Sequence, residues 1–503
     1  MVAYLRRNTA LLVTLGIVLA ILLWMTNRYE PKVTASIILS GLTLGALYFL
    51  VASGLSLIFG LMDVLNFAHG MLFMMGAYLG FTAYANPRLL LNTLPLVLAL
   101  LGGAQVGRWL GGMLPDKLKK PWLDTALHLA LFVLSVAVIL FAVRGFNVQP
   151  LVANSATAAG GAISTADAQE AASLYIPRLL WLTLAGVLLG LGLSRVGPVA
   201  TRRHTRWTGA LIGVGLVAVA IAIVPLRTPA ETFLLSVSSN IRFVLALLVG
   251  LVAGGALGAL MESALIRPLY SRPLYQILLT LGVSFVGTEL IKTIWGTAGF
   301  YMDIPAFAAA SGEGCPSPNL WSWFSDHCAS IDVLGRPFPS YRIFIIGLGL
   351  VIFIAVALLL QRSRIGIIIR AGVQDSEMVQ ALGINVRRVF TLVFALGSAL
   401  AAVGGVAAAP FLGVNLGLGA EVQLQGFIAV VIGGMGSYIG AAVGALLVGM
   451  ARAFGDQLVL SGIQLPWMDE AIRMSPSIAR ASTVLIMALV LLVRPAGLFG
   501  KKE

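Results

Sequence analysis

The sequence predicts an all-α protein, a polytopic bundle of transmembrane helices. Of its 503 residues, 59% are hydrophobic and 11% are charged, and the mean hydropathy is +0.96. Soluble domains carry about 25% charged residues, and no soluble fold could bury this much apolar surface. Many apolar runs also reach the length of a membrane-spanning helix, about 20 residues. A helix satisfies every backbone N–H and C=O of such a run internally, as the bilayer requires.

Apolar runs separated by polar breaks predict fourteen crossings, of which the one at 421–434 is short. An even number of crossings places both ends of the chain on one side. The first run follows Arg6 and Arg7, but no small-x-small cleavage site precedes the next run, so a spanning helix is favoured over a cleaved signal peptide. The expected crossings are 10–26, 35–59, 67–84, 94–112, 125–143, 179–194, 208–226, 243–260, 275–296, 343–360, 390–409, 421–434, 438–455 and 479–493.

The charge distribution predicts the orientation. The net charge of +13 comes from 33 Lys and Arg against 20 Asp and Glu. Lys and Arg gather in loops that stay on the cytoplasmic side of a membrane. With the N-terminus inside, 19 of them fall on inside segments and 10 on outside segments. Both termini are therefore expected in the cytoplasm, and the basic balance does not indicate nucleic-acid binding, for which no basic, aromatic-interleaved soluble face exists.

The two cysteines, Cys315 and Cys328, both fall in the expected outside loop 297–342. In an oxidising compartment two thiols separated by a short loop can close a disulfide, which is worth about 3 kcal/mol in the chain-entropy model. Two free thiols remain the alternative, because the sequence does not give the distance between the Cα atoms.

Four ordered motifs resemble one family. The core of the first, Asn66-Phe67-Ala68-His69-Gly70, is similar to the signature of Liv-type permease subunits of branched-chain amino acid ABC transporters. The match covers roughly residues 35–84 and 243–500. The other three motifs are Leu279 to Ser284 followed by Leu290 and Trp295-Gly296, the segment 364–388, and Gly433-Gly434-Met435-Gly436-Ser437 followed by Arg494 to Gly500.

The resemblance implies a fold like that of type II ABC importer permeases, with additional helices. Residues 1–34 form an additional N-terminal transmembrane helix, and 35–84 form the first part of the permease core. Residues 85–242 are an insertion with about four transmembrane helices and no counterpart in the short form of the family. The second part of the core, 243–503, includes a cytoplasmic coupling segment at 361–389.

The resemblance also implies a function: ATP-driven uptake of branched-chain or related amino acids across the bacterial inner membrane. The implied partners are a second permease subunit in a heterodimer, two ABC ATPase subunits and a periplasmic substrate-binding protein. The chain carries no motor of its own, because the G-x-x-x-x-G-K-[ST] loop is missing and Lys501 is the only lysine that follows a glycine. Urea or short amides are alternative substrates.

Two other classes of function compete with an importer subunit. A passive solute channel would not need an amphipathic cytoplasmic segment such as the one at 361–389. An intramembrane enzyme would bring ionisable residues together at one depth, and the sequence does not place them so. The four histidines are scattered and no Cys/His metal spacing occurs, so neither a cofactor nor a metal is expected.

Polar residues inside apolar segments are the candidates for a translocation path, because such residues face protein or water at membrane depth. Asn66 and His69 could line the path or could cap helix ends. The Gly433–Ser437 run could be a broken helix that lines the path or a tight turn at the membrane boundary. Gly70, Gly76 and Gly80 are expected to let helices pack closely. The predicted path residues are Asn66, His69, Thr280, Ser284, Gly433, Gly434, Gly436 and Ser437.

The coupling segment contains a candidate surface helix, Ser376 to Gly383, and Gly383 is expected to end this helix. The resemblance implies that this helix docks in a groove of an ATPase subunit, and its candidate coupling residues are Gly366, Arg370, Glu377 and Gly383. A solvated loop is the alternative. Two further charges fall in an apolar run, Glu289 and Lys292, and their spacing predicts an ion pair on one helix. Glu262 lies close to Arg267 and is expected at the membrane interface.

Overall fold

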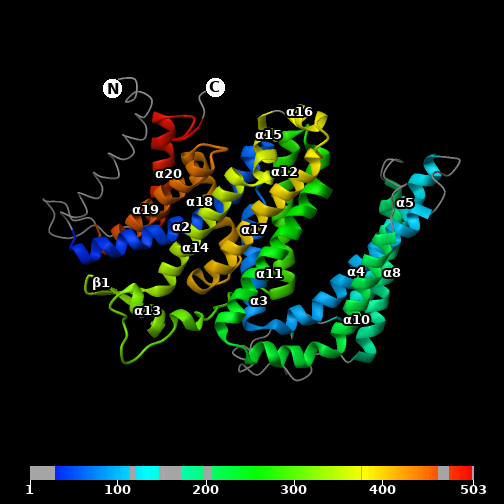
Figure 1. Cartoon of the computed structure of the whole chain (residues 1–503), viewed down its shortest axis with the longest axis horizontal. Helices are drawn as coiled ribbons and strands as arrows, with labels where there is room; N and C mark the ends of the chain where they lie inside the picture. The colour runs from blue at the N-terminus through cyan, green and yellow to red at the C-terminus, as the bar shows by residue number, and fades with distance from the viewer. Residues whose placement is uncertain are drawn as a thin grey trace. The chain divides into compact units, whose positions relative to one another are not determined.

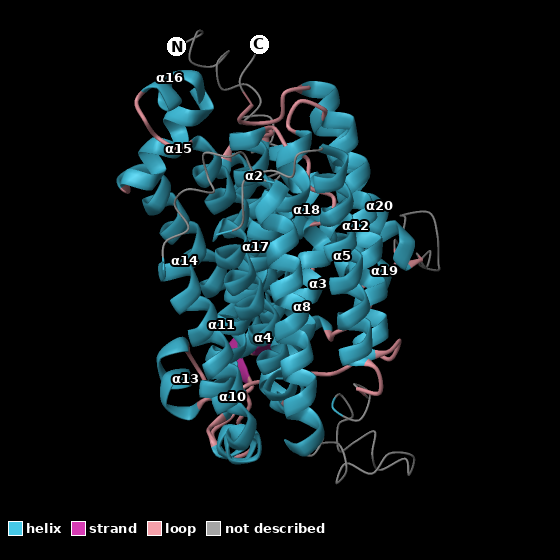
Figure 2. Cartoon of the chain, turned by 90° about the vertical axis from the view of Figure 1, so that its right-hand side faces the viewer, coloured by secondary structure: helices cyan, strands magenta, loops and turns pink. Residues whose placement is uncertain are grey.

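The computed structural model describes residues 29–113, 121–146, 151, 172–196, 207–374, 376–462 and 475–500. These residues are largely helical, apart from one antiparallel hairpin of β1 (Ser330–Val333) and β2 (Arg336–Pro339) (Figure 2). Within them, ten helices are long and apolar enough to cross a membrane. The predicted all-α polytopic fold is confirmed. The expected crossing at 10–26 lies outside the described residues.

The chain divides into two compact units. The first comprises Met1–Phe81 and Ser239–Glu503, and the second comprises Thr82–Ser238. The insertion expected from the sequence spans 85–242. The helices of the first unit are α2 (Pro31–Met62), α3 (His69–Ala85), α11 (Ser239–Leu260), α12 (Pro273–Trp295), α13 (Leu320–Asp326), α14 (Ser340–Arg362), α15 (Arg364–Gln374), α16 (Ser376–Ala381), α17 (Val386–Leu412), α18 (Leu418–Gly433), α19 (Tyr438–Ser461) and α20 (Pro476–Val493) (Figure 1).

Helix α2 forms the centre of the first unit. In its most apolar stretch 78% of the residues are buried, against 17% in α12 and in α14. Small residues let other helices approach it: a Cβ on Gly45 would lie 3.0 Å from the Cα of Leu446 in α19. The packing role predicted for the α3 glycines is confirmed, since Gly76 lies against Ala402 and Gly80 against Val406 of α17.

The second unit consists of α4 (Pro87–Met113), α5 (Pro121–Val143), α8 (Ala172–Val196) and α10 (Trp207–Ser236). Glycines of α4 face α8 closely, so these two helices pack backbone against backbone. A buried polar network joins three of the helices: Arg227 donates to Asn92 Oδ1 at 2.7 Å, and its guanidinium lies over the Tyr175 ring. Pairing of this kind is what makes a buried arginine tolerable.

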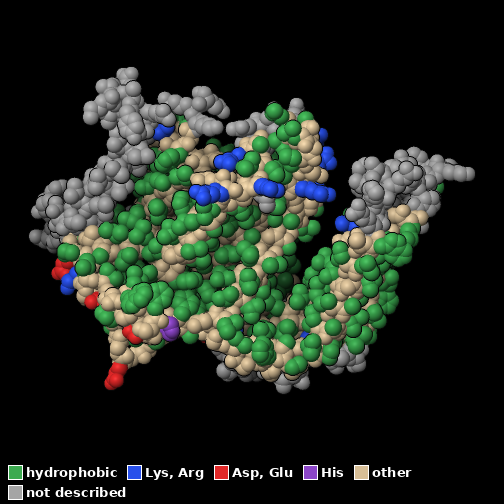
Figure 3. All heavy atoms as spheres, viewed as in Figure 1, with side chains coloured by type: hydrophobic (Ala, Val, Ile, Leu, Met, Phe, Trp, Pro, Cys, Tyr) green, Lys and Arg blue, Asp and Glu red, His purple; other side chains and the backbone are tan. Residues whose placement is uncertain are grey.

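Helix α14 connects two ends of the first unit that differ in charge. Its 23 residues give about 34 Å of helix, enough to cross the hydrocarbon core. Beyond its last residue lie α15 and α16, and Lys and Arg side chains gather at that end, whereas Asp and Glu lie toward the other (Figure 3). The exposed residues concerned are Arg362, Arg364, Arg370, Arg387 and Arg388 at the first end and Asp303, Glu313 and Asp326 at the second.

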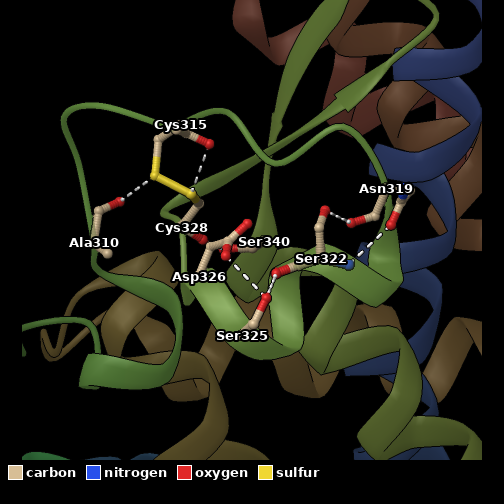
Figure 4. The surroundings of a disulfide bond; sticks show 9 residues. Ala310, Cys315, Asn319, Ser322, Ser325, Asp326, Cys328 and Ser340 are labelled. Carbon is tan, nitrogen blue, oxygen red and sulfur yellow. Dashed lines mark hydrogen bonds between the residues drawn. A yellow bond between two sulfur atoms is a disulfide. The ribbon is translucent and has the colours of Figure 1, made fainter.

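The loop that precedes α14 contains a disulfide between Cys315 and Cys328, whose Cα atoms are 5.6 Å apart (Figure 4). Ser340, the first residue of α14, donates a hydrogen bond to the carbonyl of Cys328 at 2.6 Å. The side chain of Asn319 caps α13 by accepting from the N–H groups of Trp321 and Ser322. The disulfide and the cap therefore hold an irregular loop against the start of a membrane-spanning helix.

Two acidic residues of the apolar segments, Glu289 and Glu262, form ion pairs. The predicted pair of Glu289 and Lys292 is confirmed, with a distance of 2.7 Å. Glu262, in the π-helical turn Met261–Ile266, is fully buried within the protein, and its expected place at the membrane interface stays a prediction. It accepts two hydrogen bonds from Arg267, at 2.8 and 3.1 Å, and one from Thr391 of α17 at 2.6 Å. The Tyr270 hydroxyl also donates to it, and burial together with this bond raises the pKa of Tyr270 above its ordinary value.

Candidate functional site

The first unit contains a cavity of about 470 Å³ between α2, the α17–α18 connection, α19 and the start of α14. We call it the charged cavity, because its lining includes Arg336, Arg342, Glu421, Arg452 and Asp456. A second cavity of about 590 Å³ shares Asn415, Glu421 and Arg452 with it and extends toward α20. Both volumes fall in the range of about 300–1,000 Å³ that is usual for ligand sites.

The charged cavity extends from one end of the unit to the middle of two helices that are long enough to span a membrane. Arg336 of β2 and Arg342 of α14 line the cavity, so one side of it lies next to the disulfide-bonded loop. Tyr48 and Arg452 line it near the middle of α2 and of α19, both of which are long enough to span a membrane. Ionisable side chains at this depth are costly unless they pair or face water. The position of Arg452 therefore marks the cavity as a candidate site.

Arg452 is the centre of a cluster of three charges. Its Nε lies 3.2 Å from Asp456 Oδ1, one turn later on α19, and its Nη2 lies 3.4 Å from Glu421 Oε1 in the first turn of α18. The arginine side chain is 15% exposed, whereas those of Glu421 and Asp456 are 45% and 48% exposed. The third nitrogen, Nη1, is buried and has no hydrogen-bond partner among the described residues.

The backbone that borders the charged cavity is irregular. Helix α17 ends at Leu412, and α18 begins at Leu418 after a non-helical connection. Asn415 in this connection accepts from the N–H of Gly417 at 3.0 Å and lines the cavity. Non-helical backbone at membrane depth is tolerated where it is buried in protein or faces a water-filled space. The connection thus contributes a polar side chain, that of Asn415, to the cavity wall.

A second helix also begins inside the unit, next to α18. Helix α3 starts at His69 after the non-helical residues 63–68, and Gly70 lies against Gly419 of α18. The Gly70 N–H donates to Gln423 Oε1, and Gln423 Nε2 donates to the Asn66 carbonyl at 3.5 Å. The two helix starts are therefore joined by a side chain of α18 as well as by packing.

Comparison with known proteins assigns a family. The family described as "Branched-chain amino acid transport system / permease component" matches residues 37–199 and 208–493. The chain belongs to this family. The match extends through most of the second unit as well as the first. It accords with the apolar helices of the structure, and the chain is a multi-pass membrane protein.

Curated relatives match over shorter stretches. The chain is 37% identical over 161 residues to the high-affinity branched-chain amino acid transport system permease protein BraD of Pseudomonas aeruginosa, covering 32% of this chain and 46% of the relative. It is 34% identical over 151 residues to the permease protein LivH of Salmonella typhimurium, covering 30% and 44%. The fructose import permease protein FruF of Bifidobacterium longum is 29% identical over 225 residues, covering 43% and 56%. The chain thus spans about half the length of these relatives. No solved structure matches.

Two of the predicted path residues of this family member lie together. Asn66 Oδ1 accepts from the Ala68 N–H at 3.0 Å, within the turn that precedes α3. Thr280 of α12 is buried, and its hydroxyl oxygen accepts from the Phe67 N–H at 3.2 Å. Ser284, one turn further along α12, is half-buried. None of these three residues lines the charged cavity or the second cavity, so their place on a path stays a prediction.

His69 is fully buried beneath α2. Neither ring nitrogen has a hydrogen-bond partner of acceptable geometry among the described residues. The ring lies over Gly54, where a Cβ would come within 2.7 Å of Nε2. His69 does not line the charged cavity or the second cavity either, so its place on a path also stays a prediction.

For the run from Gly433 to Ser437, the structure has the tight turn rather than a broken helix. Helix α18 ends at Gly433, and Ser437 caps α19 by accepting from the Gly440 N–H at 3.1 Å. Gly434 and Gly436 have positive φ angles, +101° and +83°, which favour glycine. The Leu498 and Phe499 N–H groups donate to the carbonyls of Ile432 and Gly433, so two family motifs contact each other here.

The coupling segment forms two helices, α15 and α16, where the sequence predicted one. The predicted helix at Ser376 is confirmed, and Gly383 follows its end with a φ of +81°. Gly366 packs against the end of α14, and Arg370 is exposed. The Glu377 side chain lies outside the described part of the structure. The roles of these four residues in coupling stay predictions.

Sequence reasoning missed the residues of the charged cavity. The signal was present: Glu421, Arg452 and Asp456 all fall at or within apolar runs, as Glu289 and Lys292 do. The Gly413 to Gly419 stretch, with three glycines and Asn415, also marked the break between α17 and α18. What the sequence did not reveal is that α18 and α19 bring these residues together.

Proposed function

We propose that this chain is the membrane-spanning permease subunit of an ATP-driven ABC importer for branched-chain or related amino acids in the bacterial inner membrane. The observation that carries the proposal is the charged cavity, which brings Glu421, Arg452 and Asp456 together at membrane depth. A transport subunit needs such a polar space within an apolar bundle, whereas a structural membrane protein does not. The names of BraD and LivH support the substrate class.

The proposed partners follow from this role. A second permease subunit, in a heterodimer, would complete the path, two ABC ATPase subunits would supply the energy, and a periplasmic binding protein would deliver the substrate. Helix α15 and the start of α17 offer an exposed basic surface for an ATPase subunit, with Arg364 and Arg370 on α15 and Arg387 on α17. The positive-inside rule puts that end in the cytoplasm together with both termini, and the disulfide-bonded loop in the periplasm.

Two alternatives predict other substrates or another mechanism. FruF is named as a fructose import permease, and urea or short amides are also neutral, so this family could serve an uncharged solute. The charges in the cavity favour a substrate that carries charges itself. A neutral solute would displace water from these charges without replacing its interactions with a charge of its own. A passive channel would conduct without ATP.

Reconstitution separates these possibilities. The chain would be incorporated into liposomes with its second permease subunit and the ATPase subunits, and the binding protein would be added outside. We expect uptake of labelled leucine, isoleucine and valine only with ATP inside, and little uptake of urea or fructose. Conduction of leucine by the chain without ATPase subunits would exclude the importer, and ATP-driven uptake of fructose alone would exclude the substrate class.

A further inference from the structure

We propose that Arg452, Glu421 and Asp456 form a binding site for the two charges of an amino-acid zwitterion inside the charged cavity. In this site Arg452 receives the substrate carboxylate, and the two acidic side chains receive its ammonium group. The proposal rests on the function proposed above and extends it, because neither the family match nor the names of the relatives assigns these residues a role.

The hydrogen-bond geometry of Arg452 leaves a place for a carboxylate. A guanidinium has five N–H donors in a fixed planar fork. In Arg452 one edge is used, since Nε donates to Asp456, and Nη2 contacts Glu421 at 3.4 Å, which is long for a charged pair. Nη1 is buried and has no partner among the described residues. Buried donors of this kind are normally satisfied, so Arg452 has donor capacity to spare. The long contact of Nη2 with Glu421, another residue of the cavity wall, is the one that a carboxylate would replace.

The two carboxylates are suited to an ammonium group. Glu421 and Asp456 keep close to half of their side-chain surface exposed, whereas Arg452 keeps only 15%. Each ionised carboxylate has about four acceptor positions, and the contacts with Arg452 use few of them. A substrate carboxylate that competes for Arg452 would weaken the contacts of Arg452 with Glu421 and Asp456. A bound ammonium group would then neutralise the negative charge of these two acids.

The rest of the lining suits an aliphatic side chain. Beside the charges, the cavity wall is formed by Ile37, Leu44, Leu418, Val422 and Ala453. Charges on one part of the wall and branched apolar side chains on another match an amino acid with an apolar side chain. A sugar carries no charge to match Arg452, Glu421 or Asp456. An aliphatic carboxylate would compete for Arg452 and would bring no cation for the two acids.

Thiol protection tests binding directly. Ser40 lines the cavity, and the two natural cysteines are bonded to each other, so Ser40→Cys introduces the reactive thiol of the chain. In the full transporter in nanodiscs, leucine at millimolar concentration should slow labelling of this thiol at least threefold. Isocaproate, which lacks the ammonium group, and isoamylamine, which lacks the carboxylate, should protect little. Equal protection by isocaproate, or a thiol that no reagent reaches, would overturn the proposal.

Transport by variants separates this proposal from the proposed function. If the wild-type transporter does not take up leucine, the importer assignment itself fails. If it does, Arg452→Gln should lower leucine uptake at least about tenfold, the lower end for losing a hydrogen bond to a charged group. ATP hydrolysis stimulated by the loaded binding protein should continue, which shows that the variant is folded and assembled.

Further variants serve as controls for the Arg452→Gln measurement. Arg452→Lys should restore part of the uptake because it keeps the charge, and Glu421→Gln should impair uptake without abolishing leucine-stimulated ATP hydrolysis. Glu289→Gln removes an exposed acid of another ion pair and should leave uptake unchanged. Uptake by Arg452→Gln at the wild-type rate would overturn the proposal.

Discussion

Gly54 of α2 lies directly beneath the imidazole of His69, so that a Cβ at residue 54 would come within 2.7 Å of Nε2. This relationship lets α3 begin within the bundle, two helical turns before the end of α2. The buried ring fills the space that a side chain on α2 would otherwise occupy. The absence of a side chain at Gly54 of α2 therefore makes room for the start of α3 at His69.

We expect Gly54→Ala to destabilise the protein by about 1–3 kcal/mol, because the added methyl group overpacks a filled core. The midpoint of thermal unfolding of the full chain in detergent measures the effect. Gly282→Ala is the matched control, since a Cβ at that helical position of α12 meets nothing within 4 Å. The free energy of unfolding of Gly282→Ala should be unchanged or should rise by about 0.5–1 kcal/mol. A loss of equal size in both variants would contradict the packing argument.

Glu262 should contribute strongly to stability although it is a buried charge. We expect Glu262→Gln to cost about 1.5–3 kcal/mol, because it removes a charge that binds Arg267, Thr391 and Tyr270. Glu289→Gln, in an exposed pair, should change stability by less than about 1 kcal/mol. Thermal unfolding of both variants under the same conditions compares them, and equal losses would refute the assignment.

The same cluster predicts a pH dependence. The pKa of Tyr270 is raised in the folded protein by burial and by its bond to Glu262. The stabilisation from this bond is fully present below the ordinary tyrosine pKa of about 10 and is lost as the pH rises toward the raised value. At pH 8, Tyr270→Phe should therefore have a lower midpoint of thermal unfolding than the wild type. Above pH 10 the difference between the two midpoints should become smaller, because the wild type loses this stabilisation. A difference that grows with pH would have the wrong sign.

The disulfide should be present in the native protein. Thiol labelling under denaturing conditions, before and after reduction, counts the free cysteines. We expect labelling of Cys315 and Cys328 only after reduction, and reduction should cost about 3 kcal/mol for a loop closed over a separation of 13 residues. A double serine variant gives the background signal. Equal labelling with and without reductant would show two free thiols.

The coupling segment should transmit motor movement without touching substrate. We expect Glu377→Lys to uncouple ATP hydrolysis from uptake, because docking of an ATPase subunit depends on the charges of a surface helix. Glu313→Lys reverses an exposed acid in the disulfide-bonded loop and should have little effect on coupling. Uptake and hydrolysis are measured on the same proteoliposomes. Normal uptake by Glu377→Lys would remove the basis for the assignment.

The sequence predicted individual helices more successfully than the candidate site. Every crossing expected after residue 34 coincides with a helix, and the short helix at Ser376 ends before Gly383 as expected. The sequence did not distinguish two interpretations of the Gly433–Ser437 run, because a turn and a broken helix have the same local composition. The structure has the turn, and the C-terminal segment donates hydrogen bonds to the carbonyls of Ile432 and Gly433 beside it.

The sequence by itself determined the all-α architecture, since the bilayer forces each long apolar run to satisfy its own backbone hydrogen bonds. It also indicated the pairing of Glu289 with Lys292, which are three residues apart on one helix. Only the tertiary structure decided that Arg452 meets Glu421, 31 residues earlier in the chain. That contact depends on which faces of α18 and α19 pack together, and small residues along both helices set this packing rather than any local pattern of charge.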